Sequence, residues 1–157
     1  MNRRALTVAV LVLLQAALVV LAVAPRLSAH LRGEEYRVRV APIDPIDPFR
    51  GAYVALTYPD LQPRGRDLRD LPSGRVYVPL VEQEGFWVAD GLVRERPDQA
   101  PYLACDSDGW SLSCGIESWF AGQDEARRLE AVVVDGAVAT IKVDDRGHAA
   151  VVDLAEE

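Results

Sequence analysis

Glu117 is the titratable side chain whose neighbours in the sequence are least typical of a solvated residue. It lies between Ile116 and Trp119 in an apolar stretch that we interpret as a strand. A charge in apolar surroundings costs free energy unless it is paired. Glu117 is therefore predicted either to form a structural salt bridge, which is the favoured interpretation, or to bind a ligand.

Other residue types that carry catalysis lack the patterns that catalysis needs. The chain has no Gly-x-Ser-x-Gly elbow, and no motif places a serine beside its single lysine, Lys142. Neither His30 nor His148 shows the spacing of metal ligands. The acidic pairs at 34–35, 144–145 and 156–157 are interpreted as solvated turns or tails. We predict no metal and no cofactor, and a binding function is favoured over catalysis.

Cys105 and Cys114 are predicted to form a disulfide, because they are an even pair in a domain that we place outside the cytoplasm. A two-residue turn at 108–109 would pair Cys105 with Leu112 instead. Direct pairing of the two cysteines requires a longer loop, such as 108–111, or a bulge. No Cys-x-x-Cys motif supports redox chemistry.

The stretch 42–59 is the element around which the chain is organised. Its two Asp-Pro steps exclude a helix or an interior strand, and Gly51 suits a sharp entry into a strand over 52–58. Both faces of that strand are mostly apolar, which predicts an interior strand covered on both sides. Its aromatic residues and two tryptophans are interpreted as core residues rather than as a stacking platform: Tyr53, Tyr58, Trp110 and Trp119.

Two blocks of the sequence resemble the bacterial GDYXXLXY proteins, whose signature is Gly-Asp-Tyr-x-x-Leu-x-Tyr. The first block matches that signature at Gly51, Tyr53, Leu56 and Tyr58, and Asp44 and Arg50 are similar to the family's lead-in. The second block, 114–120, resembles the family's Gly-Ile-Glu-x-Tyr-Phe segment and contains Gly115, Glu117 and Trp119. The family has no assigned biochemical activity, so the resemblance implies location and architecture rather than a reaction.

The resemblance has two consequences for single residues. Arg50 is the expected partner of Glu117, because the two residues lie in the two resembling blocks. Ala52 stands where the motif has Asp. If that Asp were catalytic or a metal ligand, this chain should lack the activity, whereas a turn cap would be lost at a cost of about 1 kcal/mol or less.

The N-terminal segment carries the clearest signal for location. Arg3 and Arg4 precede an apolar run over 5–24 that only Thr7 and Gln15 interrupt. A helix of about 20 residues spans roughly 30 Å, enough to cross the hydrocarbon core, whereas signal-peptide cores have about 7–15 residues. We favour a retained anchor over a cleaved signal or a buried helix, because Pro25 follows the cleavage-like residues 22–24. Gln15 is either a contact with a partner helix or a tolerated polar residue.

The positive-inside rule places the two leading arginines in the cytoplasm. The prediction is thus a single-pass protein of the bacterial inner membrane, with an anchor over 1–29 and a periplasmic domain over 30–157. The 157 residues carry a net charge of −7, and without the three arginines of the N-terminal segment the rest carries about −10. This acidity argues against nucleic acid and against docking on anionic lipid through the domain surface.

Short strands are predicted for most of the domain, at 35–41, 52–58, 75–81, 85–93, 102–105, 110–120, 131–135, 137–143 and 148–154. Pro79 predicts that its strand is an edge or bulged strand. Residues 135–136 are typical of a type I′ hairpin turn, residues 144–147 predict a second turn, and 123–129 predicts one or two helical turns. The fold class predicted is all-β, a sandwich or partly closed barrel of about eight or nine short strands preceded by one transmembrane helix.

The function that we expect is binding to, or assembly with, another integral membrane protein. The anchor confines the domain to the bilayer surface and so raises its effective concentration for such a partner. The alternative is a periplasmic hydrolase-like or solute-binding domain with a site near Arg50 and Glu117.

Overall fold

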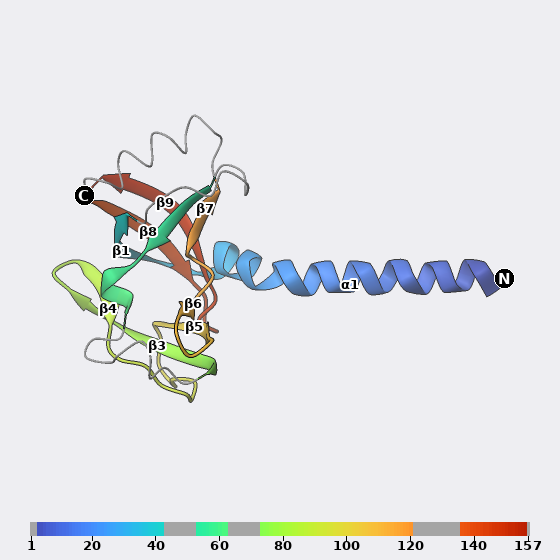
Figure 1. Cartoon of the computed structure of the whole chain (residues 1–157), viewed down its shortest axis with the longest axis horizontal. Coiled ribbons are helices and arrows are strands. Elements are labelled where there is room, and N and C mark those ends of the chain that lie inside the picture. The colour runs from blue at the N-terminus through green and yellow to red at the C-terminus, as the bar shows by residue number, and fades with distance from the viewer. Residues whose placement is uncertain (1–2, 43–52, 63–72, 121–135, 157) are drawn as a thin grey trace.

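A computed structural model describes residues 3–42, 53–62, 73–120 and 136–156 of the chain. In this part, one long helix, α1 (Arg3–Arg32), projects from a body of nine strands, as Figure 1 shows. The strands form two curled antiparallel sheets, which agrees with the predicted all-β class. The predicted hairpin at 135–136, strand at 131–135 and helical turns at 123–129 fall wholly or partly outside the described residues.

Helix α1 is longer than the predicted membrane span. It runs from Arg3 through Pro25 to Arg32, so the helix continues beyond the predicted apolar run over 5–24. Its apolar side chains are exposed along the whole run, and Ala29 near its base is the buried residue of the helix. Its last turns contact two strands of the body. The predicted boundary between anchor and domain at 29–30 therefore lies inside the helix.

The first sheet has five strands in the order β7-β2-β1-β8-β9. Their bounds are β1 (Glu34–Pro42), β2 (Tyr53–Thr57), β7 (Ser118–Phe120), β8 (Ala137–Val143) and β9 (Ala149–Glu156). Side chains alternate between the two faces of β1, which places Tyr36, Val38 and Val40 in the core. β8 and β9 form a hairpin through the predicted turn at 144–147.

The second sheet has four strands in the order β4-β3-β5-β6. Their bounds are β3 (Gly74–Gln83), β4 (Phe86–Ala89), β5 (Tyr102–Ser107) and β6 (Leu112–Ser113). The inward residues of β3, which are Val76, Val78 and Leu80, share one hydrophobic cluster with those of β1 and β8. The core therefore lies between the two sheets, as in a sandwich. A short 3₁₀ turn, η1 (Pro59–Leu61), follows β2 and adds Leu61 to that core.

Two strand predictions need correction. β3 is an interior strand, flanked by β4 and β5, although Pro79 predicted an edge or bulged strand. The proline is tolerated because the chain after β4 runs one residue longer than β3 between the Leu80–Ala89 and Tyr77–Val93 pairs. The extra residue thus lies in the segment that follows β4. No carbonyl group of that segment is left needing a hydrogen bond from the N–H that Pro79 lacks. The predicted strand 110–120 is in fact split into β6 and β7, which belong to different sheets.

Candidate functional site at the base of the helix

The two motif blocks, about sixty residues apart in sequence, lie side by side in the fold. β2 carries the first block and pairs with β7 of the second, with Val54 opposite Trp119 and Ala55 opposite Ser118. The amide of Leu56 donates to the carbonyl of Glu117 at 2.9 Å and extends this pairing. The motif spacing therefore builds one antiparallel ladder at the edge of the five-stranded sheet.

Tyr58 anchors the first block to the second from inside the core. Its buried hydroxyl donates to the carbonyl oxygen of Ile116 at 2.8 Å. Burial, and then the nearby charge of Glu117, raises the pKa of Tyr58 far above its ordinary value. The hydroxyl therefore stays protonated and remains a donor. Leu56 is also fully buried, so these two motif residues belong to the core.

The carboxylate of Glu117 is held by backbone N–H groups. Its oxygens accept hydrogen bonds from the amides of Cys114 and Gly115, the latter at 3.0 and 3.2 Å. These bonds close a tight turn just before β7, at which Gly115 has a positive φ of 84°. In the described residues, Glu117 thus organises the backbone where the chain crosses between the two sheets.

The predicted disulfide is present and joins this crossing segment to β5. The Cys105 and Cys114 sulfur atoms are 2.00 Å apart, and their Cα atoms are 4.1 Å apart. The loop is the longer of the two forms considered, because β5 and β6 pair through Ser107 and Leu112. Asp108 holds that loop by accepting bonds from the amides of Trp110 and Ser111, which lower the pKa of its carboxyl group.

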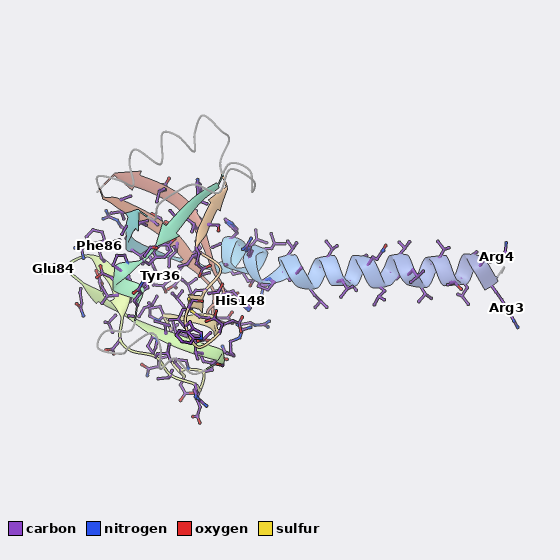
Figure 2. All side chains as sticks on the ribbon, in the orientation of Figure 1. Arg3, Arg4, Tyr36, Glu84, Phe86 and His148 are labelled. Atoms are coloured by element: carbon purple, nitrogen blue, oxygen red, sulfur yellow. A yellow bond between two sulfur atoms is a disulfide. The ribbon has the colours of Figure 1, made fainter. Side chains whose placement is uncertain are left out.

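The base of α1 is fixed on the β8–β9 hairpin. Gly33 follows the helix, donates to the carbonyl of Ala29 at 2.9 Å, and lies so close to β8 that a Cβ there would be 2.8 Å from the amide nitrogen of Val143. The side chain of Ser28 interacts with the carboxylate of Asp144 in the hairpin turn and helps to lower its pKa. Figure 2 shows His148 near this junction, with Arg3 and Arg4 at the far end of the helix.

Asp144 is buried, although the sequence predicted a solvated turn. Its carboxylate lies 3.0 Å from Nδ1 of His148 and accepts from the amides of Arg146 and His148, both at 2.9 Å. Burial opposes ionisation, but the hydrogen bonds from Ser28, His148 and the backbone outweigh it and lower the pKa of Asp144.

The three residue types of a catalytic triad meet here, in Ser28, Asp144 and His148. Their side chains do not contact one another in the order that a triad needs. In a triad the serine hydroxyl contacts the imidazole, which removes its proton. Here the serine interacts with the carboxylate, and the imidazole of His148 lies 3.0 Å from the same carboxylate. The arrangement therefore secures the helix to the hairpin, and it does not activate a nucleophile.

A cleft of about 270 Å³ opens beside this junction. Arg26 and His30 line it from α1, Ser118 and Trp119 from β7, and residues 150–152 from β9, with Gly115 at the crossing segment. Trp119 also packs against the core, so it connects the cleft wall to the interior. The second motif block therefore forms one wall of a cleft whose other wall is the helix.

A scan against protein-family models matches the model described as GDYXXLXY protein over residues 15–154. This match covers most of the helix and nearly all of the body. The chain belongs to the GDYXXLXY family. Comparison with curated proteins found no match, and comparison with solved structures found none either.

For this GDYXXLXY protein, the predicted site residues divide into three groups. Leu56, Tyr58, Gly115, Glu117 and Trp119 come together across the β2–β7 ladder. Tyr53 belongs to β2, and its backbone pairs with Phe120, but its side chain lies outside the described part. Asp44, Arg50, Gly51 and the departing residue Ala52 also lie outside it. The pairing of Arg50 with Glu117, and the hydrolase-like alternative built on that pair, stay predictions.

The two residues that line the cleft from α1 in this GDYXXLXY protein were not predicted from the sequence. Arg26 and His30 are four residues apart and therefore lie on one face of α1. Arg26 is also the first charged residue after the apolar run. Those two facts were available in the sequence, but nothing in it indicated that β7 and β9 would face them.

Proposed function

We propose that this protein is a single-pass, membrane-anchored, extracytoplasmic β-domain that binds another integral membrane protein. The observation that carries the proposal is the exposure of the apolar side chains of α1. Its leucine and valine side chains between residues 6 and 23 are half or more exposed, and none of its most apolar window is covered by the described part of the domain. Such a surface requires lipid or another protein around it.

The energy involved is large. Burying one Leu or Val side chain contributes about 1.5–3 kcal/mol, and a dozen of them are exposed on α1 between residues 6 and 23. Exposing these side chains to water would therefore cost on the order of 20 kcal/mol. A bilayer removes that cost, because an apolar helix of this length crosses its hydrocarbon core and satisfies its own backbone. Membrane anchoring is therefore the state that this helix favours.

Two further features support an extracytoplasmic domain. Arg3 and Arg4 precede the apolar run, which favours a cytoplasmic N-terminus. The disulfide between Cys105 and Cys114 is typical of an oxidising compartment. A reporter fused to the C-terminus tests the orientation: an enzyme active only after export should be active there, and activity of a strictly cytoplasmic reporter would contradict it.

Retention of the anchor is tested by the intact mass of the purified chain. The expected mass includes the first 24 residues, because α1 continues through Pro25 into a turn that packs on the domain. A chain shortened after Ala24 would instead show that the segment is a cleaved signal.

The partner is tested through the one amide side chain in the apolar run. A photo-crosslinking residue at Gln15 should give one discrete adduct with an integral membrane protein. The same residue at Ala17, about 200° around the helix, serves as the matched control. Repeated recovery of the chain alone, or equal labelling from both positions, would contradict a specific helix partner.

A further inference from the structure

We propose that the cleft between α1 and β9 binds the phosphate of an anionic lipid headgroup, with the guanidinium of Arg26 as its main ligand. The inference rests on the membrane anchoring proposed above and adds a ligand class and a site to it. Three independent observations carry it: the depth of Arg26, the charge of the cleft, and the side chains that surround the guanidinium.

The depth of the cleft matches the headgroup layer. The apolar run ends at Ala24, and a helix rises about 1.5 Å per residue, so Arg26 lies roughly 3 Å and His30 roughly 9 Å beyond it. The polar layer on each side of the hydrocarbon core is about 5–7 Å thick. The backbone of Arg26 is therefore placed within this layer and that of His30 roughly 2 Å beyond it. Lipid phosphates occupy the same depth.

The cleft is locally cationic on an acidic molecule. Its lining residues include Arg26 and His30 but no Asp or Glu. Within the described residues, the Arg26 side chain forms no ion pair or hydrogen bond, and the nearby carboxylate of Glu117 is engaged by the amides of Cys114 and Gly115. The chain without the three arginines of its N-terminal segment carries about −10, which disfavours broad attraction to anionic lipid. An uncompensated cation at this one place therefore favours a single bound anion.

The surrounding side chains suit a phosphate that is attached to a lipid. A guanidinium binds phosphate oxygens through parallel N–H donors, and the Ser118 hydroxyl and a ring N–H of His30 are additional donors in the same cleft. Trp119 lines the cleft as well, and tryptophan favours the membrane interface. Val152, which is partly exposed, adds apolar surface that fits the glycerol region of a lipid. Free inorganic phosphate would use the donors and leave that apolar surface uncovered.

The test counts bound lipids on the full-length chain in mild detergent by native mass spectrometry. Phosphatidylglycerol is compared with phosphatidylcholine of the same acyl chains, and inorganic phosphate is added as a competitor. Arg26→Gln removes the proposed ligand. Arg32→Gln is the matched control, because it removes the same charge from the same helix outside the cleft.

We expect the wild type and Arg32→Gln to retain one phosphatidylglycerol that Arg26→Gln binds at least about tenfold more weakly, since hydrogen bonds to charged groups are of that strength. Phosphatidylcholine should bind less well, and millimolar phosphate should not displace the lipid. Equal retention by Arg26→Gln and the wild type would overturn the site. Displacement by phosphate would show that a lipid is not the ligand of this cleft. An adduct with a protein in place of the lipid would show the same.

Two controls separate this inference from the proposed function. The thermal unfolding midpoint of Arg26→Gln should equal that of the wild type, because the side chain is exposed. Arg26→Gln should also remain in the membrane fraction. Loss of the lipid with anchoring intact supports the site, whereas recovery of the wild type in the soluble fraction would refute the anchoring and the lipid site together.

Discussion

Single residues of the two motif blocks act on the protein's own backbone. Tyr58 donates to the carbonyl of Ile116, and Glu117 accepts from the amides of Cys114 and Gly115. Each side chain thus satisfies a backbone group at a place where the ladder between β2 and β7 ends. Buried polar groups of this kind specify one arrangement of the chain, because every alternative leaves a donor or acceptor unpaired.

Replacing Tyr58 with Phe tests the inward half of this arrangement. The substitution keeps the ring and leaves the buried carbonyl of Ile116 without its donor, so we expect the free energy of unfolding to fall by about 1–3 kcal/mol. Urea unfolding followed by tryptophan fluorescence measures the change. Tyr77→Phe is the matched control, because its hydroxyl makes no hydrogen bond within the described residues, and it should change stability by about 0.5 kcal/mol or less. Equal effects would mean that the bond contributes nothing.

Asp144 makes stability depend on pH. Its pKa in the folded protein is lowered from the usual 3.8, so the unfolded chain binds the proton more tightly. The stabilisation is therefore fully present above pH 3.8 and is lost as the pH falls through the lower, folded pKa. Asp144→Asn should be less stable at pH 7, by about 1–3 kcal/mol, and should lose less stability on acidification.

The control for this prediction is Asp153→Asn, which replaces an exposed aspartate in β9 of the same hairpin. Parallel urea titrations at pH 7 and pH 3 should show the altered acid response for Asp144 alone. An unchanged pH dependence in Asp144→Asn would show that the hydrogen bonds of this carboxylate do not couple protonation to folding.

At this scale the sequence indicated that Glu117 needs partners but not that these include backbone amides, and it gave no indication that Asp144 is buried. Glu117 is conspicuous because apolar residues flank it, so its need for partners could be predicted. Asp144 stands in an Asp-Asp-Arg-Gly turn that has the composition of a solvated loop. Its burial is imposed by Ser28 and the helix base, more than a hundred residues earlier, and no local pattern contains that contact.

Individual strands follow from local alternation, whereas their pairing does not. Short apolar runs bounded by turn residues predicted β1, β3, β8 and β9 with bounds close to those observed. The stretch 110–120 misled the prediction because no proline interrupts it, and the break between β6 and β7 is created by the Glu117 turn and the disulfide. Partner choice is decided by the shared core, which joins residues distant in sequence.

The two sheets meet closely at Gly147, and a glycine comparison tests how much that contact contributes. Its carbonyl accepts from the amide of Ala104 at 2.8 Å, and a Cβ there would lie 2.7 Å from the Tyr102 ring and 2.8 Å from the Ala104 nitrogen. Gly147→Ala should therefore force the β8–β9 turn away from β5. Gly85→Ala shares the positive φ but has open space around its Cβ, so it isolates the backbone strain.

We expect Gly85→Ala to lower the free energy of unfolding by about 1–2 kcal/mol, the cost of a left-handed non-glycine residue. Gly147→Ala should cost about 1–3 kcal/mol more, the usual effect of overpacking. Chemical denaturation of both variants measures the difference. If the two substitutions cost the same, the approach of the hairpin to β5 is not a tight contact.

On the scale of the whole molecule, the helix and the domain are two parts that contact each other at the base of the helix. Ala29, Gly33 and the interaction of Ser28 with Asp144 hold the helix base against β8 and β9. The presence of the helix could be predicted from composition alone, because a run of about twenty residues with only two polar members has few other uses. Its continuation through Pro25 to Arg32 could not, because proline normally ends a helix pattern.

Paired arginine substitutions test whether lipid surrounds the apolar run of α1 over residues 5–24. Leu13→Arg with Leu14→Arg places two charges at the middle of the apolar run, where each costs about 2.5–3.5 kcal/mol, so the carbonate-resistant membrane fraction should fall steeply. Leu27→Arg with Leu31→Arg makes the same change at exposed positions of the same helix beyond the run, and this variant should remain in the membrane. Equal partitioning of the two double variants, in either fraction, would refute the span, because only a bilayer distinguishes these two exposed parts of one helix.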